Sequence, residues 1–505
     1  MRPMRALRQV DGVLVGAVAL GGGLRVWGLG SQSFWYDEWL TAEATSGGLG
    51  HVLHHVAHRE GIPPPWFGFM WVWAGVFGDG EVALRAPSVL AGIATIPVAY
   101  LVAWQLGQPR AVARAAALLV AVNPMLVWYS QEARPYSILA FVGALSLLAM
   151  LRWRASDRHA DAVVWAAVCA TAVAVHYFAV FLVAAEAAAL VVERPGRWRR
   201  VLLACGPAVA VLAALAPIAA EQHSHDANRA WITDFPLADR LRDAGRSALV
   251  GPSPPAAWLW VAAALALALP GLLLLARGSG DGRRGLAMTG GVGALAVVLA
   301  VIAAVVALDA VVARYLIASL VPLVVAAALT LGAARPRWLG GAALAVLCAV
   351  SLAAVVAVAR DPDLQRPDWR SVAAAHRSGS APGDHGRVLV LNTHGDLAGP
   401  LRTYLPSARP LGLHQRVDVD RIDVLVVDPT SKPCNFLVGR ACSLVFLGAP
   451  LPAPVAGRVR LERRIHTGQF TVDRYRASRP LTVTLADLVA EPDRADALVL
   501  VTTAP

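Results

Sequence analysis

The stretch "VALRAPSVLAGIATIPVAYLVAW" (82–104) carries a single charged side chain, Arg85, and is long enough to cross a membrane as one helix. About 20 apolar residues in helical conformation span the ~30 Å hydrocarbon core of a bilayer. Ten further apolar runs fill the chain up to residue 359: 12–29, 111–128, 136–151, 160–176, 177–193, 201–220, 256–276, 286–308, 315–334 and 338–359. The sequence therefore predicts a polytopic α-helical membrane domain over residues 1–359, with about 11 transmembrane helices.

The composition agrees with this prediction. Of 505 residues, 57% are hydrophobic and 16% are charged, and the mean hydropathy is +0.55. A soluble protein is typically ~45–50% apolar and ~25% charged, so a soluble enzyme with one buried core is excluded. The net charge of +11 comes almost entirely from arginine, since Lys432 is the only lysine. This bias is typical of GC-rich codon usage, and we expect no nucleic-acid partner.

The distribution of arginine predicts the topology. If the N-terminus is cytoplasmic and the spans alternate, arginine is concentrated in the short cytoplasmic segments, as the positive-inside rule requires. These segments are 1–9, 105–114, 152–159, 194–200, 277–285 and 335–337. The first apolar run has no small-residue cleavage site, so we expect an uncleaved span. We therefore predict a multi-pass protein of the bacterial cytoplasmic membrane, with its N-terminus inside and its C-terminal domain outside.

Two stretches are ambiguous by length alone. "WFGFMWVWAGVFG" (66–78) is shorter than the ~17 residues of a spanning helix, and counting it as a span would invert the arginine pattern. We predict a helix in the outer interface, where tryptophan is favoured. The same test divides 160–193 into two short spans that turn at "HYF" (176–178).

The composition changes near residue 360, and residues 360–505 are predicted to form an extracytoplasmic α/β domain of a usual domain size. Short β-type runs occur at 387–392, 421–428, 442–448 and 471–476. Helical candidates lie between them, at 367–377 and 397–405.

The five cysteines divide into two groups. Cys169, Cys205 and Cys348 fall inside predicted spans, where they act as small apolar side chains. Cys434 and Cys442 lie outside the membrane, where a disulfide is permitted. We expect that bridge, with two free thiols as the alternative.

The strongest functional signal is "SFWYDEW" (33–39), directly after the first span. Asp37 and Glu38 are paired carboxylates among aromatic residues at the predicted membrane surface. Acidic groups are costly to desolvate there, so they usually have a partner or a function, and one could act as general base toward a hydroxyl. The alternative is a solvated pair of loop acids.

Further candidates lie at the outer ends of other spans. "NPMLVWYSQEARPYSI" (123–138) contains Glu132, Arg134 and Tyr136, and "DAVVARYLIASLVP" (309–322) contains Arg314 and Tyr315. The guanidinium fork suits a phosphate, and tyrosine suits the interface. The alternatives are a local ion pair within an aromatic belt and an arginine that reaches the headgroups. Arg85 is a further candidate, for which a structural pair with Glu81 is the simpler interpretation.

Histidines and one intramembrane acid complete the set of candidates. The side chains of His51, His54, His55 and His58 are spaced to share one helical face. This spacing could bind zinc, although a hydrated interfacial face is the favoured interpretation. His176 lies at the tip of a predicted helical hairpin and could reach the site. Glu186, inside a span, is expected to face the helix bundle and a hydrogen-bond partner.

Taken in order, these motifs resemble the family 39-like glycosyltransferases of the GT-C type, which include protein mannosyltransferases and lipid A aminoarabinose transferases. The matching stretches are "FWYDEW", "IPPPWF" (62–67), "EVALRAPSVLAG" (81–92), "NPMLVWYSQEARPYSI", "HYFA" (176–179), "ARYLIASLVP" and "RPDWRSVAA" (366–374). Ile62 stands where the family usually has a histidine. The resemblance covers about residues 1–375.

The resemblance implies sugar transfer from a polyprenyl-phosphate donor to an acceptor hydroxyl outside the membrane. It assigns Asp37 as the general base of an inverting transfer, Glu38 as its neighbour and Glu132 as the acid of the second loop. Mannose and arabinose both fit as the sugar, of which we expect mannose, and the acceptor is expected to be a protein, a lipoglycan or a polysaccharide. No nucleotide is needed by this chemistry, and two alternatives stay open for a metal: Asp37 and Glu38 share a divalent ion, or neither needs one.

Two other classes of function remain as alternatives. A transporter or flippase of lipid-linked glycan would need polar groups near the middle of the bilayer, where Glu186 is the main example. A non-catalytic membrane scaffold would leave Asp37, Glu132 and Arg314 without a purpose. We therefore favour a glycosyltransferase.

Overall fold

The computed structural model describes residues 11–225, 232–256, 258–277, 280–307, 309–379, 386–392, 399–427, 451–468, 470–489 and 497–503. The chain forms two compact units. The first comprises Met1–Leu29 and Leu40–Ala359, and the second comprises Gly30–Trp39 and Arg360–Pro505. The division after Ala359 lies at the position where the composition of the sequence changes, and residues 30–39 group with the C-terminal unit.

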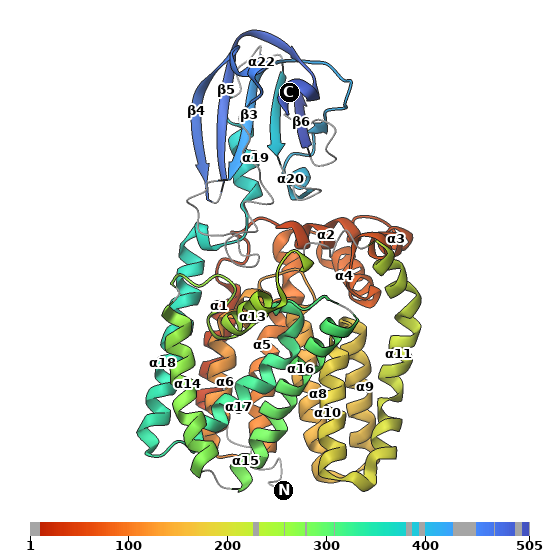
Figure 1. The fold of residues 1–505 in the computed structure, drawn as a ribbon, viewed down its shortest axis with the longest axis vertical. Helices are drawn as coiled ribbons and strands as arrows, with labels where there is room; N and C mark the ends of the chain where they lie inside the picture. Colours follow the sequence, from red (N-terminus) through yellow and green to blue (C-terminus); the bar gives the residue numbers. More distant parts are fainter. Residues whose placement is uncertain are drawn as a thin grey trace. The chain divides into compact units, whose positions relative to one another are not determined.

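The first unit is a helical bundle (Figure 1). The helices in the N-terminal part of the chain are α1 (Gly12–Val26), α2 (Tyr36–Thr45), α3 (Leu49–Arg59), α4 (Pro64–Phe77), α5 (Glu81–Gln105), α6 (Arg110–Val122), α7 (Pro124–Ser130) and α8 (Tyr136–Ser156). The first residues of α2 belong to the second unit. The following helices are α9 (His159–Val175), α10 (Ala179–Glu193), α11 (Trp198–Ser224), α13 (Leu237–Val250), α14 (Trp258–Arg277), α15 (Gly280–Leu286), α16 (Val292–Val306), α17 (Leu320–Ala333) and α18 (Arg337–Arg360). Each of the eleven apolar runs corresponds to one or more of these helices.

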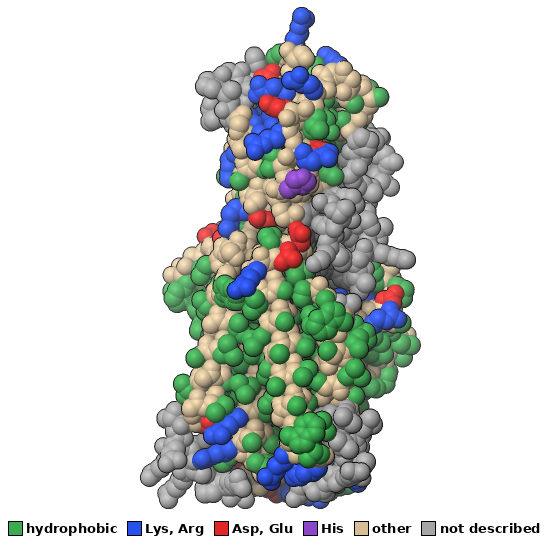
Figure 2. Space-filling model, turned by 90° about the vertical axis from the view of Figure 1, so that its left-hand side faces the viewer, with side chains coloured by type: hydrophobic (Ala, Val, Ile, Leu, Met, Phe, Trp, Pro, Cys, Tyr) green, Lys and Arg blue, Asp and Glu red, His purple; other side chains and the backbone are tan. Residues whose placement is uncertain are grey.

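The lengths of the helices support a multi-pass membrane protein. Within the described ranges, six helices are long and apolar enough to cross a bilayer, and a seventh span results if α6 and α7 are counted together. Three shorter apolar helices, Gly12–Val26, His159–Val175 and Trp258–Ala268, also correspond to predicted spans. Figure 2 shows one face of the helical bundle covered by hydrophobic side chains. Leu203 and Val306 are among the most exposed apolar residues, which is favourable in lipid and costly in water.

The bend between α6 and α7 is caused by proline. The two helices meet at 53°, at Asn123-Pro124. Because Pro124 has no N–H, the carbonyl of Val120 cannot make its usual helical hydrogen bond. The Arg25 guanidinium of α1 replaces it, with Nη2 donating to Val120 O at 3.1 Å and Nη1 donating to Ala121 O at 2.9 Å. A fully buried arginine thus completes the backbone hydrogen bonding at this bend.

Close packing joins the same region to α5. A Cβ atom added at Gly92 would lie 2.1 Å from the Ser130 Oγ and 2.8 Å from the Arg25 Nε. Only glycine allows α5 to approach α1 and α7 this closely, as is common where membrane helices pack. The Arg25 Nε also donates to the Ser130 Oγ at 3.2 Å.

Glu186 lies inside the bundle, as expected. The Ser146 hydroxyl of α8 donates to Glu186 Oε1 at 2.8 Å, and the Trp165 indole of α9 donates to Glu186 Oε2 at 2.7 Å. Two neighbouring helices therefore bond to one acid on α10. This arrangement gives Glu186 a structural role, and it does not favour a transport pathway.

Several arginine-rich segments lie at one end of the bundle. Arg154 at the end of α8 pairs with Glu193 at the end of α10, and Arg114 on α6 pairs with Asp11, the residue that caps α1. Asp11 accepts hydrogen bonds from the first turn of α1 and from Tyr100. These contacts join segments that the positive-inside rule assigns to the same side of the membrane.

The second unit contains a six-stranded mixed sheet (Figure 1). Its strands are β1 (Gly386–Asn392), β2 (Arg409–Pro410), β3 (Val417–Val427), β4 (Val459–Thr467), β5 (Phe470–Val483) and β6 (Ala497–Thr503). The spatial order is β2-β6-β1-β3-β5-β4, and the β1–β3 pair is parallel, with Val388 opposite Ile422. The other pairs are antiparallel.

Alternating side chains of β1 build a core on each face of the sheet. Leu389 and Leu391 pack with the helices α19 (Trp369–Arg377) and α20 (Gly399–Tyr404). Val388 and Val390 pack in a second cluster with α22 (Ala453–Ala456) and α23 (Leu485–Leu488). The predicted α/β class of this region is therefore confirmed.

The segment 30–39 joins the second unit through specific contacts. The Ser33 hydroxyl donates to Pro367 O at 3.1 Å, and the Phe34 N–H donates to the Tyr404 hydroxyl oxygen at 2.7 Å. A Cβ atom at Gly399 would lie 2.4 Å from the Trp39 ring, so this contact requires glycine. Sequence reasoning assigned these ten residues to the membrane domain because a hydrophobicity pattern cannot reveal long-range hydrogen bonds.

The other expectations for the second unit have mixed outcomes. The predicted helices at 367–377 and 397–405 correspond to α19 and α20, and the predicted strands at 387–392, 421–428 and 471–476 correspond to β1, β3 and part of β5. The strands β2, β4 and β6 were not predicted. The strand expected at 442–448 and the disulfide expected between Cys434 and Cys442 lie outside the described residues. Cys169, Cys205 and Cys348 are free.

Candidate functional site

A buried ion pair joins two loops of the first unit. Glu60 directly follows α3, and Arg134 lies between α7 and α8. Arg134 Nη1 donates to Glu60 Oε1 at 2.8 Å and Nη2 donates to Oε2 at 2.9 Å, and both residues are 4% exposed. Arg134 Nη1 also lies 3.3 Å from the Thr41 hydroxyl oxygen of α2. Two parallel bonds between ionised groups are among the strongest hydrogen-bonded arrangements in proteins.

The backbone of the Arg134 loop is also fixed. The Ser88 hydroxyl of α5 donates to Arg134 O at 3.0 Å. The Ser137 hydroxyl donates to Ser88 O at 2.8 Å and lies 3.3 Å from the Ser130 hydroxyl. The Arg134 Cζ atom lies 5.8 Å from the centre of the Phe67 ring, over its face. Arg134 is therefore held by both its side chain and its backbone.

Next to this pair lies an aromatic cluster, which consists of Tyr136, His176, Phe178 and Tyr315. The His176 and Tyr315 ring centres are 4.9 Å apart, and those of Phe178 and Tyr315 are 5.0 Å apart. Tyr136 completes the cluster at 5.9 Å from His176. The Arg314 Cζ atom lies 5.9 Å from the Tyr136 ring centre and 5.6 Å from that of Tyr315. Such a distance allows a cation–π interaction with both rings.

His176 is neutral in this environment. It lies in the turn between α9 and α10 and is 1% exposed. Burial, together with the positive charges of Arg134 and Arg314, lowers the pKa of His176 from 6.5 to about 3. Its Nδ1 accepts a hydrogen bond from the Phe178 N–H at 3.2 Å, so the proton of the neutral ring is on Nε2. In the described part of the chain, this buried Nε2 has no hydrogen-bond partner.

The structure brings together five of the residues singled out from the sequence. These are Arg134, Tyr136, His176, Arg314 and Tyr315. Glu132 is fully buried in the loop that also carries Arg134. Arg85 is buried on α5 and donates from Nη1 to Leu29 O at 2.7 Å, so it supports the end of the first span. Asp37 and Glu38 occupy the first turn of α2 and group with the second unit.

Sequence reasoning missed Glu60, the partner of Arg134. Its position two residues before the quoted "IPPPWF" stretch was the available signal, since an acid between an interfacial helix and a proline-rich turn needs a partner. Phe178 and Ser88 were also missed, because their roles depend on contacts across the bundle.

The histidines of α3 do not share one environment. His51, His54 and His58 are accessible, but His55 is 3% exposed, so the prediction of one hydrated face was wrong for His55. Burial and neighbouring positive charges lower the pKa of His55 to about 4. Although the spacing of the four α3 histidines is compatible with zinc, their imidazoles do not form a metal-binding group with one another in the described part of the chain. A different group, His58 with Glu221 and His225, has the potential to hold a metal ion.

Comparison with known proteins agrees with the fold and the motifs. A family model described as dolichyl-phosphate-mannose-protein mannosyltransferase matches residues 62–220. ArnT from Cupriavidus metallidurans in the apo state is 14% identical, with a TM-score of 0.54. ArnT bound to undecaprenyl phosphate is 13% identical, with a TM-score of 0.50. Both comparisons cover 92% of this chain and 98% of ArnT.

This chain has the fold of ArnT, and its residues 62–220 match the mannosyltransferase family model. The family model and ArnT agree with the resemblance inferred from the ordered motifs, and the expected polytopic fold with a strand-containing C-terminal unit is confirmed. An oligosaccharyltransferase from Archaeoglobus fulgidus, in complex with Zn and sulfate, is 15% identical with a TM-score of 0.42. That comparison covers 74% of this chain, which spans 56% of the length of the archaeal protein. No curated protein matches the sequence.

The Glu60–Arg134 pair should be essential for the stability of the protein. Glu60→Gln or Arg134→Met leaves a buried charge without its partner, which typically costs about 3–5 kcal/mol. The double variant should be less destabilised than the sum of the two single variants. Thermal unfolding of the detergent-solubilised protein measures this coupling. The exposed Arg242–Asp239 pair provides the control, with an expected coupling of about 0–1 kcal/mol. Additive effects at Glu60 and Arg134 would contradict the assignment.

His176 should make the stability of the protein depend on pH. Because its folded-state pKa lies below the unfolded value of 6.5, the unfolded chain takes up a proton that the folded chain does not. The free energy of unfolding should therefore fall as the pH falls from 6.5 towards 3. From pH 7 to pH 5 the loss should be about 2 kcal/mol. His176→Gln should reduce this loss, and an unchanged pH dependence in thermal unfolding would show that His176 is not buried in neutral form.

Proposed function

We propose that this protein is a glycosyltransferase that moves a sugar from a polyprenyl-phosphate donor to an acceptor hydroxyl on the outer face of a bacterial cytoplasmic membrane. Mannose is the proposed sugar, since the matching family model describes mannosyltransferases. Undecaprenyl phosphate bound to ArnT supports a polyprenyl-phosphate carrier. The observation that carries the proposal is the guanidinium of Arg314 above two tyrosine rings and beside a buried, neutral histidine.

Arg314 is the proposed contact for the donor phosphate. A sugar bonded through its anomeric carbon to a lipid phosphate has a good leaving group, and the phosphate gains negative charge as the bond breaks. A guanidinium held in place by aromatic rings stabilises this charge most in the transition state. The Arg134 fork binds Glu60, so we assign Arg134 to positioning this region and to the local positive potential.

The aromatic cluster is the proposed binding surface for the sugar. Tyr136 and Tyr315 offer apolar ring faces and hydroxyl groups, a combination that suits the two faces of a sugar ring. His176 Nε2–H is a buried donor that a sugar hydroxyl oxygen could satisfy. Glu132 and Arg85 remain proposed substrate-binding residues. The contribution of Arg85 would be indirect, because its guanidinium bonds to Leu29 O and so fixes the end of the first span.

Asp37 is the proposed general base of an inverting transfer. It lies in the first turn of α2, next to Glu38. The acceptor oxygen must lose a proton as it attacks the anomeric carbon, and a carboxylate can accept that proton. Because the phosphate leaves without protonation, one carboxylate is sufficient, whereas glycosidases generally use two. Glu38 is proposed to orient Asp37 or the acceptor.

The proposed topology places the second unit outside the cell. Eleven spans and the concentration of arginine at one end of the bundle support a cytoplasmic N-terminus. The acceptor would then be a protein, a lipoglycan or a polysaccharide of the cell envelope. The α/β unit could bind that acceptor, since the segment with Asp37 belongs to it.

Asp37→Asn should abolish transfer while the donor still binds. The amide retains the shape of the side chain but cannot accept the proton, and positioned general-base catalysis contributes about 10²–10⁴ in rate. Glu38→Gln should reduce the rate less. Single-turnover transfer and donor binding should be measured for both variants. Asp79→Asn, at an exposed loop acid, is the matched control. Near-normal transfer by Asp37→Asn would assign the base to another residue, with Glu132 the next to test.

Arg314→Ala should weaken donor binding by about 10- to 100-fold, because a charge-assisted hydrogen bond contributes roughly 1.5–3 kcal/mol. Arg314→Lys should recover part of the loss, since it restores the charge without the fork. Donor titrations at fixed acceptor concentration measure the effect. Arg242→Ala, at an exposed arginine of α13, is the control. Wild-type donor affinity in Arg314→Ala would show that Arg314 only packs on the tyrosine rings.

A further inference from the structure

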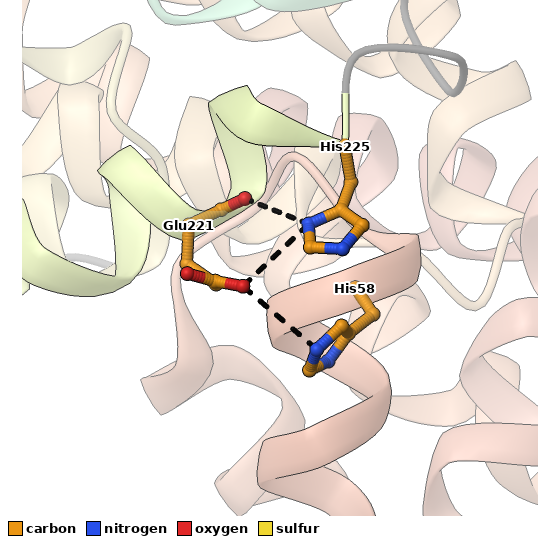
Figure 3. A group of neighbouring side chains, drawn as sticks. All are labelled: His58, Glu221 and His225. Atoms are coloured by element: carbon orange, nitrogen blue, oxygen red, sulfur yellow. Dashed lines mark hydrogen bonds and ion pairs between the residues drawn. The ribbon is translucent and has the colours of Figure 1, made fainter.

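Three potential metal ligands converge where α3 meets the end of α11 (Figure 3). His58 lies in the last turn of α3, Glu221 in the last turn of α11, and His225 directly after it. His58 Nε2 lies 3.8 Å from Glu221 Oε1, and His225 Nδ1 lies 3.7 Å from the same oxygen. One ligand atom from each residue lies within 4.8 Å of the other two.

The hydrogen bonding of His58 prepares its Nε2 for a metal ion. Nδ1 of His58 lies 2.8 Å from His54 O. A carbonyl can only accept, so Nδ1 carries the proton and the lone pair of the neutral ring is on Nε2, on the side of Glu221. Metal-binding histidines usually have this arrangement, in which the second ring nitrogen donates to a carbonyl and fixes both tautomer and orientation. The His54 ring stacks on His58 at 4.2 Å and further restrains it.

His225 is restrained through the nitrogen that faces Glu221. Its Nδ1 lies 3.0 Å from the backbone carbonyl of Glu221, as Figure 3 shows, so binding a metal ion through Nδ1 requires this nitrogen to lose its proton and exchange the carbonyl contact for the ion. Its ring also makes an edge contact with His58 at 4.7 Å. Two imidazoles and one carboxylate from segments far apart in sequence are therefore held close together, although two protonated imidazoles at this distance would repel each other.

The backbone next to the cluster is fixed by a buried glutamine. Gln222, which follows Glu221, donates from Nε2 to Val56 O at 3.1 Å and to Ile62 O at 2.9 Å. Its Oε1 accepts from the Tyr177 hydroxyl at 3.1 Å. Gln222 is 4% exposed, so these bonds connect α3 and α11 within a shielded environment. The ligand set therefore has a rigid support.

We propose that His58, Glu221 and His225 bind a divalent transition-metal ion, with Zn²⁺ as the preferred ion and water in the fourth position. Two histidines and one glutamate form a known zinc-binding set, in which Zn–N and Zn–O distances are about 2.0–2.2 Å. The three side chains are 37%, 50% and 39% exposed, so they can move closer together and the ion can enter from solvent.

The bound ion would connect the C-terminal end of α3 to the C-terminal end of α11. Glu60, which holds Arg134, follows α3 by one residue, so the ion would also restrain the position of this acid. The proposal does not depend on which sugar or acceptor the enzyme uses. It predicts metal-dependent stability, a property that can be measured without an activity assay.

The test uses full-length protein without a histidine tag, stripped with EDTA and titrated with ZnCl₂. Calorimetry and elemental analysis should find one zinc ion per chain, and zinc should raise the unfolding temperature. His58→Ala, Glu221→Gln and His225→Ala should each weaken zinc binding at least tenfold and remove the thermal shift. His223→Ala is the matched control, since it changes an exposed histidine of the same segment that lies outside the cluster.

Cobalt provides a second readout that does not depend on stability. Co²⁺ in a site with nitrogen ligands and low coordination number should give visible absorption bands in the wild type, and these bands should be lost in Glu221→Gln. The unfolding temperatures of all variants in EDTA show whether they fold. Sub-stoichiometric zinc in the wild type, or unchanged zinc affinity in folded ligand variants, would overturn the proposal.

Discussion

The Glu60–Arg134 ion pair is the interaction on which the arrangement of the candidate site depends. Both groups are removed from water, which costs several kcal/mol per ion unless each charge is matched and hydrogen bonded. The bidentate geometry meets this requirement. Through it, the segment after α3 is joined to the loop before α8, and Ser88 connects the backbone of that loop to α5. The positions of Tyr136 and its aromatic neighbours follow from this anchor.

The bilayer imposes a second constraint, which the sequence reveals directly. A spanning segment must satisfy its backbone internally and present apolar side chains to lipid, so the eleven apolar runs could be assigned to helices from hydropathy. The bend at Asn123-Pro124 illustrates what hydropathy cannot predict. The run 111–128 was expected as one span, but Pro124 divides it into α6 and α7 and requires Arg25 from another helix. In the sequence, Arg25 is an arginine inside the first apolar run, and no pattern indicates that it bonds to the backbone at the Pro124 bend.

The second unit shows where sequence patterns lose information. The strands β1 and β3 are buried on both faces, so their continuous apolar runs were recognised. By contrast, β4 (Val459–Thr467) is a largely exposed strand with several charged residues, and its sequence lacks a clear alternation. Similarly, the site residues Arg314 and His176 were found because they stand out in apolar surroundings. Glu60 was missed because its role depends on a contact with a residue 74 positions away.

The chemistry of the donor connects the fold to the proposed reaction. A lipid phosphate supplies both the membrane anchor and the leaving group, so the enzyme needs a cationic contact at the membrane surface and a base for the acceptor. The most direct test is to incubate the purified enzyme in nanodiscs with mannosyl-phosphoryl-polyprenol, radiolabelled in the sugar, and a cell-envelope acceptor fraction. Without any nucleotide, label should pass to the acceptor with release of an equal amount of polyprenyl phosphate. Bound donor that retains its label, or that only crosses the bilayer intact in proteoliposomes, would contradict the account.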